Sequence, residues 1–250
     1  MIKYFNINQK GFSIRCKLYC DNPRTIQEII IFCHGFSGFK DNKFAEKIAE
    51  RSQKKHRERA LLIFDLPCHG DDARNKLLLK DCLVYLDIVV HYARENFKAQ
   101  QLYGCGTSFG GYLLLKYIAE NDNPFTKIAL RCPAVNMYET TTNALMVTEN
   151  LKTIQKGKPV LLGFDRKVKV TKDFIDDLKK SDITQNNYHS YSDNMLIVQG
   201  NKDEVVSYEV VKTFAENNGI PLETVQNADH RFSDPKKADT AISLIISFLN

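Results

Sequence analysis

Short apolar segments recur along the chain and alternate with longer stretches in which apolar residues fall at helical spacing. The short segments are rich in β-branched residues and lack polar alternation, which is typical of strands buried on both faces of a parallel sheet. They cover residues 26–33, 60–64, 101–105, 127–132, 195–199 and 222–225. The helical stretches cover residues 42–53, 77–97, 109–119, 207–217 and the segment from 234 onward. This alternation predicts βαβ units and a mostly parallel, doubly wound α/β sheet.

The first two apolar segments depart from this alternation. Residues 2–7 and 12–19 have no helix between them, and a short turn separates them. Parallel neighbours need a crossover of a dozen or more residues, whereas antiparallel neighbours need only a tight turn. We therefore expect an N-terminal antiparallel hairpin at the edge of the sheet.

A long segment separates two of the predicted strands. Residues 134–194 are far more than a normal crossover needs. Their pattern predicts a weak helix, a hairpin and a helix capped by Thr171, at residues 138–151, 158–170 and from 171 onward. We expect a core of residues 1–133 and 195–250, with 134–194 forming an inserted lid or cap over the carboxyl edge of the sheet.

Composition narrows the class of protein. The 250 residues are 43% hydrophobic and 26% charged, which is an ordinary globular balance. The net charge of +5 gives no reason to expect a nucleic-acid partner. No apolar run is long enough to span a membrane, and the first residues lack the apolar region of a signal peptide. The seven cysteines form no CxxC pair, so we expect buried thiols in a reducing cytoplasm and no metal site.

One glycine-rich motif carries candidate chemistry. Residues Gly106 to Gly110 fit the pattern GxSxG, directly after a predicted strand and directly before a predicted helix. That context places Ser108 on the sharp turn where α/β enzymes hold a nucleophile. A dinucleotide-binding GxGxxG starting at Gly104 fails, because its last position is Phe109.

A nucleophilic serine needs a base and an acid that orients the base. In this motif's fold the chain order is serine, acid, histidine. Asp203 follows the strand at 195–199, and His230 follows the strand at 222–225, so both lie at carboxyl ends of strands. We predict the triad Ser108, Asp203 and His230, with Glu204 and Asp229 as alternatives for the acid.

An oxyanion hole requires two backbone donors. One is expected at Phe109, directly after the nucleophile, and the other in the loop after the third strand. In that loop Gly35 allows a turn and Phe36 offers its N–H, while His34 is expected to be structural. Of the other histidines, His56 and His91 fit helix surfaces, and His189 fits a solvated loop.

With these residues the chain resembles the α/β-hydrolase superfamily over essentially its whole length. The landmarks that carry the resemblance are 34–36, 65–70, the Ser108 turn, 200–203 and 229–230. Members usually carry glycine where this chain has Cys68, and His, Glu or Gln where it has Thr107 and Phe109. The loop at 34–38 and the mid-chain insertion are similar to those of feruloyl or cinnamoyl esterases and of serine aminopeptidase-like lipases and esterases. The resemblance implies a lid that forms part of an acyl or aryl pocket.

Several side chains of the insertion are candidates for that pocket. The apolar ones are Leu145, Met146, Val147, Leu151, Phe164, Val168, Phe174 and Leu178. The tyrosines Tyr138, Tyr188 and Tyr191 offer hydroxyls to a phenolic substrate. We select Met146, Phe174 and Tyr138 as substrate-binding residues, although the apolar side chains equally suit packing of the lid onto the sheet.

Together these observations predict a serine esterase acting on a small-molecule ester, without metal or organic cofactor. An aminopeptidase, amidase or thioesterase with the same triad is the alternative, and Asp71, Asp72 and Glu139 are candidates to hold a substrate ammonium. A non-catalytic binding protein and a cofactor-free haloperoxidase-like activity are the more distant alternatives. The sequence leaves the oligomeric state open, a homodimer included.

Overall fold

The computed structural model describes residues 1–72, 74 and 76–250. Its centre is an eight-stranded sheet with the order β1-β2-β4-β3-β5-β6-β9-β10. The strands are β1 (Ile2–Gln9), β2 (Phe12–Tyr19), β3 (Glu28–Cys33), β4 (Arg59–Phe64), β5 (Gln101–Thr107), β6 (Lys127–Arg131), β9 (Met195–Gly200) and β10 (Leu222–Val225). β1 and β2 form the expected antiparallel hairpin, β2 runs antiparallel to β4, and the remaining neighbours are parallel.

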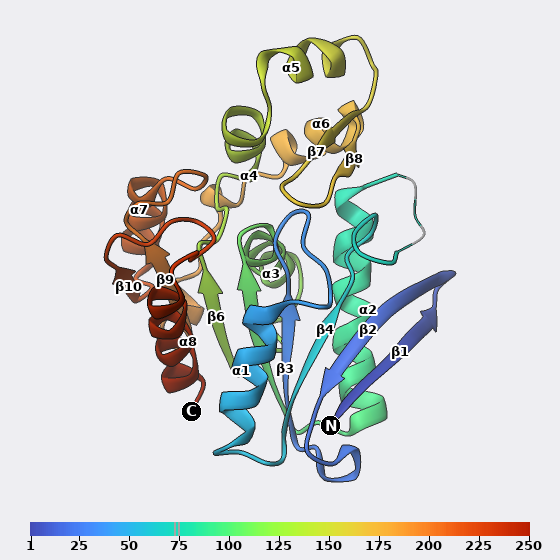
Figure 1. The fold of residues 1–250 in the computed structure, drawn as a ribbon, viewed down its shortest axis with the longest axis vertical. Coiled ribbons are helices and arrows are strands. Elements are labelled where there is room, and N and C mark those ends of the chain that lie inside the picture. The colour runs from blue at the N-terminus through green and yellow to red at the C-terminus, as the bar shows by residue number, and fades with distance from the viewer. Residues whose placement is uncertain (73, 75) are drawn as a thin grey trace.

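Helices cover both faces of the sheet (Figure 1). α1 (Lys43–Gln53) and α8 (Pro235–Leu249) pack on one face, and α2 (Leu79–Phe97), α3 (Phe109–Glu120) and α7 (Tyr208–Asn218) pack on the other. In β3, Ile30 and Phe32 point to the first face, whereas Ile29 and Ile31 point to the second. Because both faces are buried, the strand is apolar throughout, which is why the strands were recognisable in the sequence.

No helix in the described part of the chain is both long enough and apolar enough to cross a membrane.

Residues 134–194 connect β6 to β9, which are direct neighbours in the sheet. Their elements are α4 (Met137–Glu139), η2 (Thr140–Leu145), α5 (Thr148–Gln155), β7 (Val160–Leu162), β8 (Val168–Val170), α6 (Lys172–Lys180), η3 (Ile183–Gln185) and η4 (His189–Asn194). One further short helix, η1 (Pro23–Thr25), precedes β3. Figure 1 shows α4, α5, α6 and the β7–β8 hairpin beyond the carboxyl ends of β3 and β6.

The prediction of a single helix over residues 138–151 is wrong. α4 continues into the π-helical η2, the chain becomes extended at Met146, and α5 then starts separately. The hydroxyls of Thr141 and Thr142 donate to the carbonyls of Met137 and Tyr138, at 2.8 and 3.0 Å. Such back-bonding and a β-branched run weaken an α-helix, which explains the break. The predicted hairpin and the helix after Thr171 are present, but the Thr171 side chain makes no cap bond.

Candidate active site

Ser108 lies on the turn between β5 and α3 and has a positive φ of 52° with ψ −117°. This conformation is unusual for a non-glycine residue and stores strain at the turn. The flanking glycines allow it: a Cβ on Gly110 would lie 2.1 Å from the carbonyl oxygen of Cys33, and one on Gly106 would lie 2.8 Å from the carbonyl oxygen of Gly110. The strand and the helix therefore approach each other more closely than any larger residue permits.

Three side chains from separate strand ends meet at this turn. His230 Nε2 lies 3.1 Å from Ser108 Oγ, and His230 Nδ1 lies 2.8 Å from Asp203 Oδ2. Asp203 follows β9 and His230 follows β10, so the parallel strands deliver them to the same edge as β5. The arrangement suits an imidazole that accepts a proton from the serine while a carboxylate holds its other nitrogen.

The carboxylate of Asp203 is completely buried and accepts four hydrogen bonds. Besides His230, the donors are the N–H groups of Val205 and Val206, at 2.9 and 2.7 Å, and Nε2 of Gln199, at 2.9 Å. Burial alone raises the pKa of Asp203, but these hydrogen bonds and the His230 ring outweigh it and leave the pKa below its ordinary value. Asp203 is thus held as an anion.

The two alternative acids have other partners. Glu204 accepts the backbone N–H of His230 at 3.2 Å, and Asp229 accepts the backbone N–H of Ser233 at 2.8 Å. Asp203 is therefore the carboxylate that faces the imidazole.

The loop after β3 lies against the nucleophile. A Cβ on Gly35 would lie 3.4 Å from the Ser108 Cβ. His34 is buried beneath this loop: its Nδ1 lies 2.8 Å from the carbonyl of Gly35, and its Nε2 accepts the N–H of Leu66 at 3.2 Å. Burial, and then the neighbouring His69, lower the pKa of His34 to about 3, so the ring is neutral and structural in this position. Phe36 follows Gly35, and its N–H, like that of Phe109, has no partner within the described residues.

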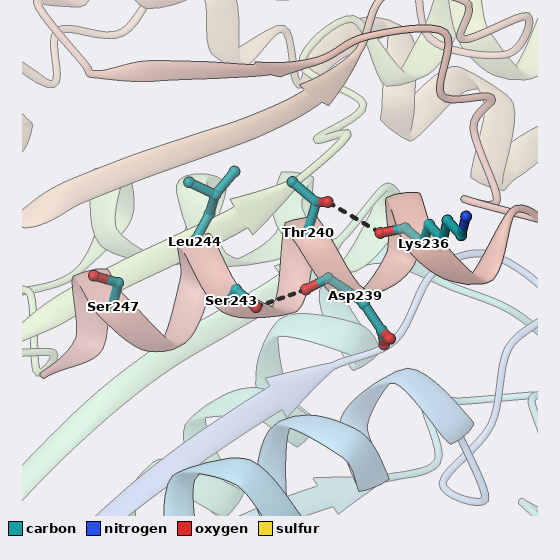
Figure 2. A pocket seen from close by; sticks show the side chains of 6 residues that line it. All are labelled: Lys236, Asp239, Thr240, Ser243, Leu244 and Ser247. Carbon is teal, nitrogen blue, oxygen red and sulfur yellow. Dashed lines mark hydrogen bonds between the residues drawn. The ribbon is translucent and has the colours of Figure 1, made fainter.

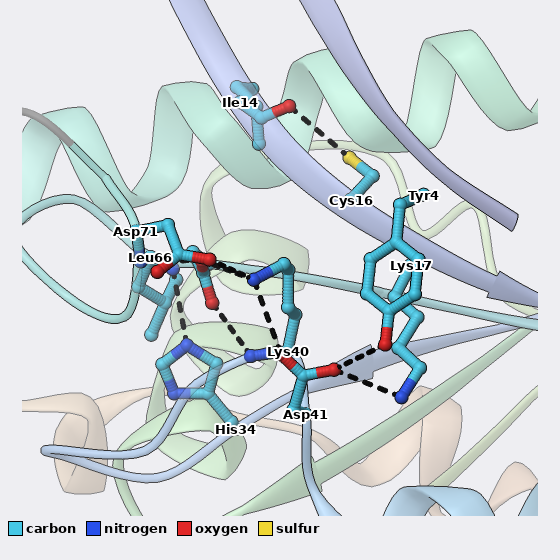
Figure 3. Close-up of polar contacts among 10 residues, drawn as sticks. Tyr4, Ile14, Cys16, Lys17, His34, Lys40, Asp41, Leu66 and Asp71 are labelled. Carbon is cyan, nitrogen blue, oxygen red and sulfur yellow. Dashed lines mark hydrogen bonds and ion pairs between the residues drawn. The ribbon is translucent and has the colours of Figure 1, made fainter.

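A polar network fixes the far end of the same loop. Buried Asp65 accepts the N–H of Lys40 at 2.6 Å and that of Asp71 at 2.9 Å. Figure 3 shows Lys40 reaching both Asp71 and Asp41, while Asp41 also binds Lys17 at 3.0 Å. These bonds hold the loop at both ends, with His34 at one and Lys40 at the other.

A cavity of about 670 Å³ opens over Ser108 and His230. The loop of residues 35–39 forms one wall, and Met137, Thr140, Leu145 and Phe164 of the 134–194 segment contribute to another. This size suits a small molecule.

The three residues selected for substrate binding do not line this cavity. Phe174 is fully buried, and its ring meets that of Phe109 edge-on at 6.0 Å. Met146 is also buried, and the Tyr138 ring lies 5.8 Å from Lys179 Nζ. The apolar face of α6 turns into the molecule, so Phe174 packs the segment onto α3 instead of reaching the cavity.

The comparison with known families agrees with this geometry. A family model described as the alpha/beta hydrolase fold matches residues 28–159. The chain belongs to the alpha/beta hydrolase fold family. No protein with a curated description matches the sequence.

Solved structures share the hydrolase fold over the whole chain. A putative hydrolase from Agrobacterium vitis S4 has a TM-score of 0.78 at 17% identity and covers 100% of both chains. Est1E from Butyrivibrio proteoclasticus, solved with ferulic acid bound, has a TM-score of 0.77 at 18% identity and covers 98% of this chain and 99% of its own. The Pyrococcus furiosus esterase Pf2001 has a TM-score of 0.71 at 14% identity, and the match covers 100% of this chain and 91% of the esterase chain. Family and neighbours together support a hydrolase.

Cys68 occupies a position where the resemblance implies glycine, and its backbone is in the left-handed region, with φ 65°. Glycine adopts this conformation without the steric penalty of a Cβ. Cys68 therefore holds a strained backbone conformation at this position. All seven cysteines carry free thiols.

In the described part of the chain, two groups of side chains bring potential metal ligands close together. Cys132, Asp203 and His230 have ligand atoms within 4.8 Å of one another, but His230 and Asp203 bind each other. Burial raises the pKa of the Cys132 thiol, which disfavours the thiolate that a metal requires. The second group is Glu28, His56 and Glu58, and Glu28 is bound to Arg59. Neither arrangement fits a metal better than the bonds already present.

A separate hollow of about 600 Å³ follows the outer face of α8 (Figure 2). Two of its hydroxyl groups bond within the helix, since Thr240 donates to the carbonyl of Lys236 and Ser243 donates to that of Asp239. None of the residues that line it belongs to the Ser108 site, and it offers no reacting group.

Two residues at the site were not recognised in the sequence. Gln199 positions Asp203, and Arg131 lines the cavity beside Ser108. In both cases the available signal was a polar residue near the end of a buried apolar strand, where a core residue is expected.

Proposed function

We propose that the protein is a serine hydrolase that cleaves carboxylic esters through an acyl-enzyme. The observation that carries the proposal is the continuous hydrogen-bonded path from Asp203 through His230 to Ser108, at 2.8 and 3.1 Å, beside the cavity. A buried anionic carboxylate, an imidazole and a serine on a strained turn are the components of nucleophilic acyl transfer.

In this mechanism Ser108 Oγ attacks the carbonyl carbon of the ester while His230 Nε2 takes its proton. The imidazolium is stabilised by Asp203, which also fixes the ring so that Nε2 faces the serine. The N–H groups of Phe36 and Phe109 bind the oxyanion. His230 then protonates the leaving alcohol, and a water molecule activated by the same ring releases the acid and restores Ser108.

Short-acyl or hydroxycinnamoyl esters are the proposed substrates. The cavity size and the similarity to Est1E, which was solved with ferulic acid bound, support this class. In the same proposal, residues 134–194 act as a lid whose Leu145 and Phe164 contact the acyl or aryl group. A cytoplasmic location stays a prediction, which cell fractionation tests.

Amide or thioester hydrolysis with the same triad is the alternative. An aminopeptidase needs a carboxylate that holds the substrate ammonium, but Asp71, Asp72 and Glu139 are not among the cavity-lining residues. Asp71 binds Lys40, and Asp72 accepts the hydroxyl of Tyr85 at 2.7 Å. The two carboxylates that do line the cavity, Asp41 and Asp165, are paired with Lys17 and Arg231. This pairing favours the ester.

The test is hydrolysis of p-nitrophenyl esters from acetate to decanoate, together with methyl ferulate. We expect Ser108→Ala and His230→Ala each to lower kcat by about 10⁴- to 10⁶-fold, and the double variant to lose little more, because the two residues act as one unit. Ser13→Ala, at an exposed position of the hairpin, is the matched control. Retained activity in folded Ser108→Ala overturns the proposal. If the wild type hydrolyses none of these esters, the alternative is tested next by measuring hydrolysis of aminoacyl amides and thioesters.

A further inference from the structure

Arg131 lines the same cavity as Ser108 and His230. It is the last residue of β6, and its carbonyl accepts the N–H of Ser108 at 2.9 Å. It is also the register partner of Thr107, the residue before the nucleophile. Arg131 therefore belongs to the strand that pairs with β5, which leads directly to Ser108.

The guanidinium of Arg131 has no ion pair or hydrogen bond within residues 1–72, 74 and 76–250, and its Nε is buried without a partner. Burial lowers the pKa of Arg131, although the group remains a cation. The two carboxylates that act on it through space are already occupied, Asp203 by four donors and Asp229 by Ser233. Arg131 is partly exposed at the cavity, and a partly desolvated cation without an anion is poorly compensated, so its N–H donors are available to an anionic ligand.

Two aromatic rings hold this side chain. The guanidinium carbon lies 4.3 Å from the ring centroid of Phe44 and 5.3 Å from that of Phe232. Rings over a guanidinium stabilise its charge and leave the N–H donors, which lie in its plane, available to a planar anion.

The rest of the cavity is also electropositive. Lys43 and Arg166 line it. Its two carboxylates are neutralised, since Asp41 binds Lys17 and Asp165 binds Arg231 at 2.8 Å. An anionic ligand is therefore favoured over a neutral or cationic one.

We infer that the substrates of this enzyme are esters that also carry a free carboxylate, and that Arg131 binds this carboxylate as the specificity-determining residue. The inference rests on the proposed ester hydrolysis and deepens it. Half-esters of dicarboxylic acids are the simplest members of the class. Arginine suits the role because its fork matches a carboxylate with two parallel hydrogen bonds.

The test compares 4-nitrophenyl hydrogen adipate with 4-nitrophenyl methyl adipate, which differ only in whether the distal carboxyl is free. We expect the wild type to prefer the free acid by about tenfold or more in kcat/KM. Arg131→Gln should lower that preference by on the order of 10- to 100-fold, and Arg131→Lys should keep part of it. Arg57→Gln, at an exposed arginine between α1 and β4, is the matched control and should keep the wild-type ratio.

Two results overturn the inference: a wild type that prefers the methyl ester, or an Arg131→Gln variant that loses both activities equally. If Arg131→Gln does not fold, the wild-type preference decides. If the wild type cleaves neither ester, the proposed function fails instead. Calorimetric binding of monomethyl adipate to the wild type then tests the carboxylate site by itself: binding that is lost in Arg131→Gln supports Arg131 as the carboxylate-binding residue, and no binding to the wild type overturns it.

Discussion

The rings of Phe36 and Phe109 meet edge to face, with their centroids 6.0 Å apart and their planes at 71°. These are the two residues whose N–H groups we propose as the oxyanion hole. Phe109 is fully buried, and it also stacks on Tyr112 at 6.1 Å. The contact joins the loop after β3 to the turn that bears Ser108, so the two donors are held relative to each other by packed side chains.

Phe36→Leu tests this coupling. Leucine keeps an apolar side chain but loses the edge-on contact, which should loosen the loop and lower kcat by roughly 10- to 100-fold with a smaller change in KM. Steady-state kinetics on p-nitrophenyl butyrate measures both. Phe125→Leu is the control, because Phe125 is equally buried but precedes β6, away from the cavity. Equal losses in the two variants would show that the contact has no special role.

The strand ends explain why so much of the site was visible in the sequence. Strands buried on both faces appear as unbroken apolar runs, and their carboxyl ends in a parallel sheet share one edge. Ser108, Asp203 and His230 each directly follow such a run, and the structure brings them together. The choice among Asp203, Glu204 and Asp229 required distances, because all three carboxylates lie near the same edge.

The 134–194 segment was less predictable because its elements depend on tertiary contacts. The hydroxyls of Thr141 and Thr142 donate to backbone carbonyls four residues earlier, which weakens the expected helix. A hydrophobic pattern carries no information about these hydrogen bonds. The hydrophobic pattern predicts Phe174 in the cavity, whereas its ring packs on Phe109. An apolar helix face gives the same pattern in either role. The sequence does not mark Arg131 as a site residue, because a single charge at the end of a buried apolar run is also typical of an ordinary strand terminus.

Stability should fall in acid because of buried neutral histidines. The pKa of His34 is lowered to about 3 by burial and by His69, and burial lowers that of His69 to about 4. The unfolded chain protonates both near pH 6.5, so the unfolded state binds more protons between that pH and the folded-state values. The free energy of unfolding is then highest above pH 6.5 and decreases as the pH falls, by about 1.4 kcal/mol per pH unit for each proton.

Urea unfolding of His34→Asn between pH 4 and 7 checks this dependence. Asparagine remains neutral, so the slope of the free energy of unfolding against pH should decrease by the contribution of about one proton. The free energy of unfolding at pH 7 should also fall, because hydrogen bonds of the His34 ring are lost. His189→Asn, at an exposed position, should keep the wild-type slope. An unchanged slope in His34→Asn would contradict the assignment of a neutral buried ring.

The strained backbone at Cys68 predicts that glycine is tolerated better than alanine at this position. With φ at 65°, any residue with a Cβ is disfavoured, whereas glycine is not. Cys68→Gly and Cys68→Ala both lose the thiol contacts, but only glycine relieves the strain. We expect Cys68→Gly to be more stable than Cys68→Ala by about 1 kcal/mol, or about 2–4 °C in Tm for a chain of this size. Equal melting temperatures in thermal unfolding would argue against strain at this position.

Leu145 and Phe174 separate the two roles that apolar residues of the segment can play. Leu145 lines the cavity, so Leu145→Ala should enlarge it and raise the octanoate-to-acetate ratio of p-nitrophenyl ester hydrolysis. Phe174 is fully buried outside the cavity, so Phe174→Ala should destabilise the protein by about 3–5 kcal/mol through loss of packing. Phe174→Ala should change the octanoate-to-acetate ratio less than Leu145→Ala does, when both are measured at a temperature where both variants are folded. A larger change in the ratio for Phe174→Ala would mean that the acyl chain reaches beneath α6, and the wall of the binding site would then lie deeper than the cavity around Ser108.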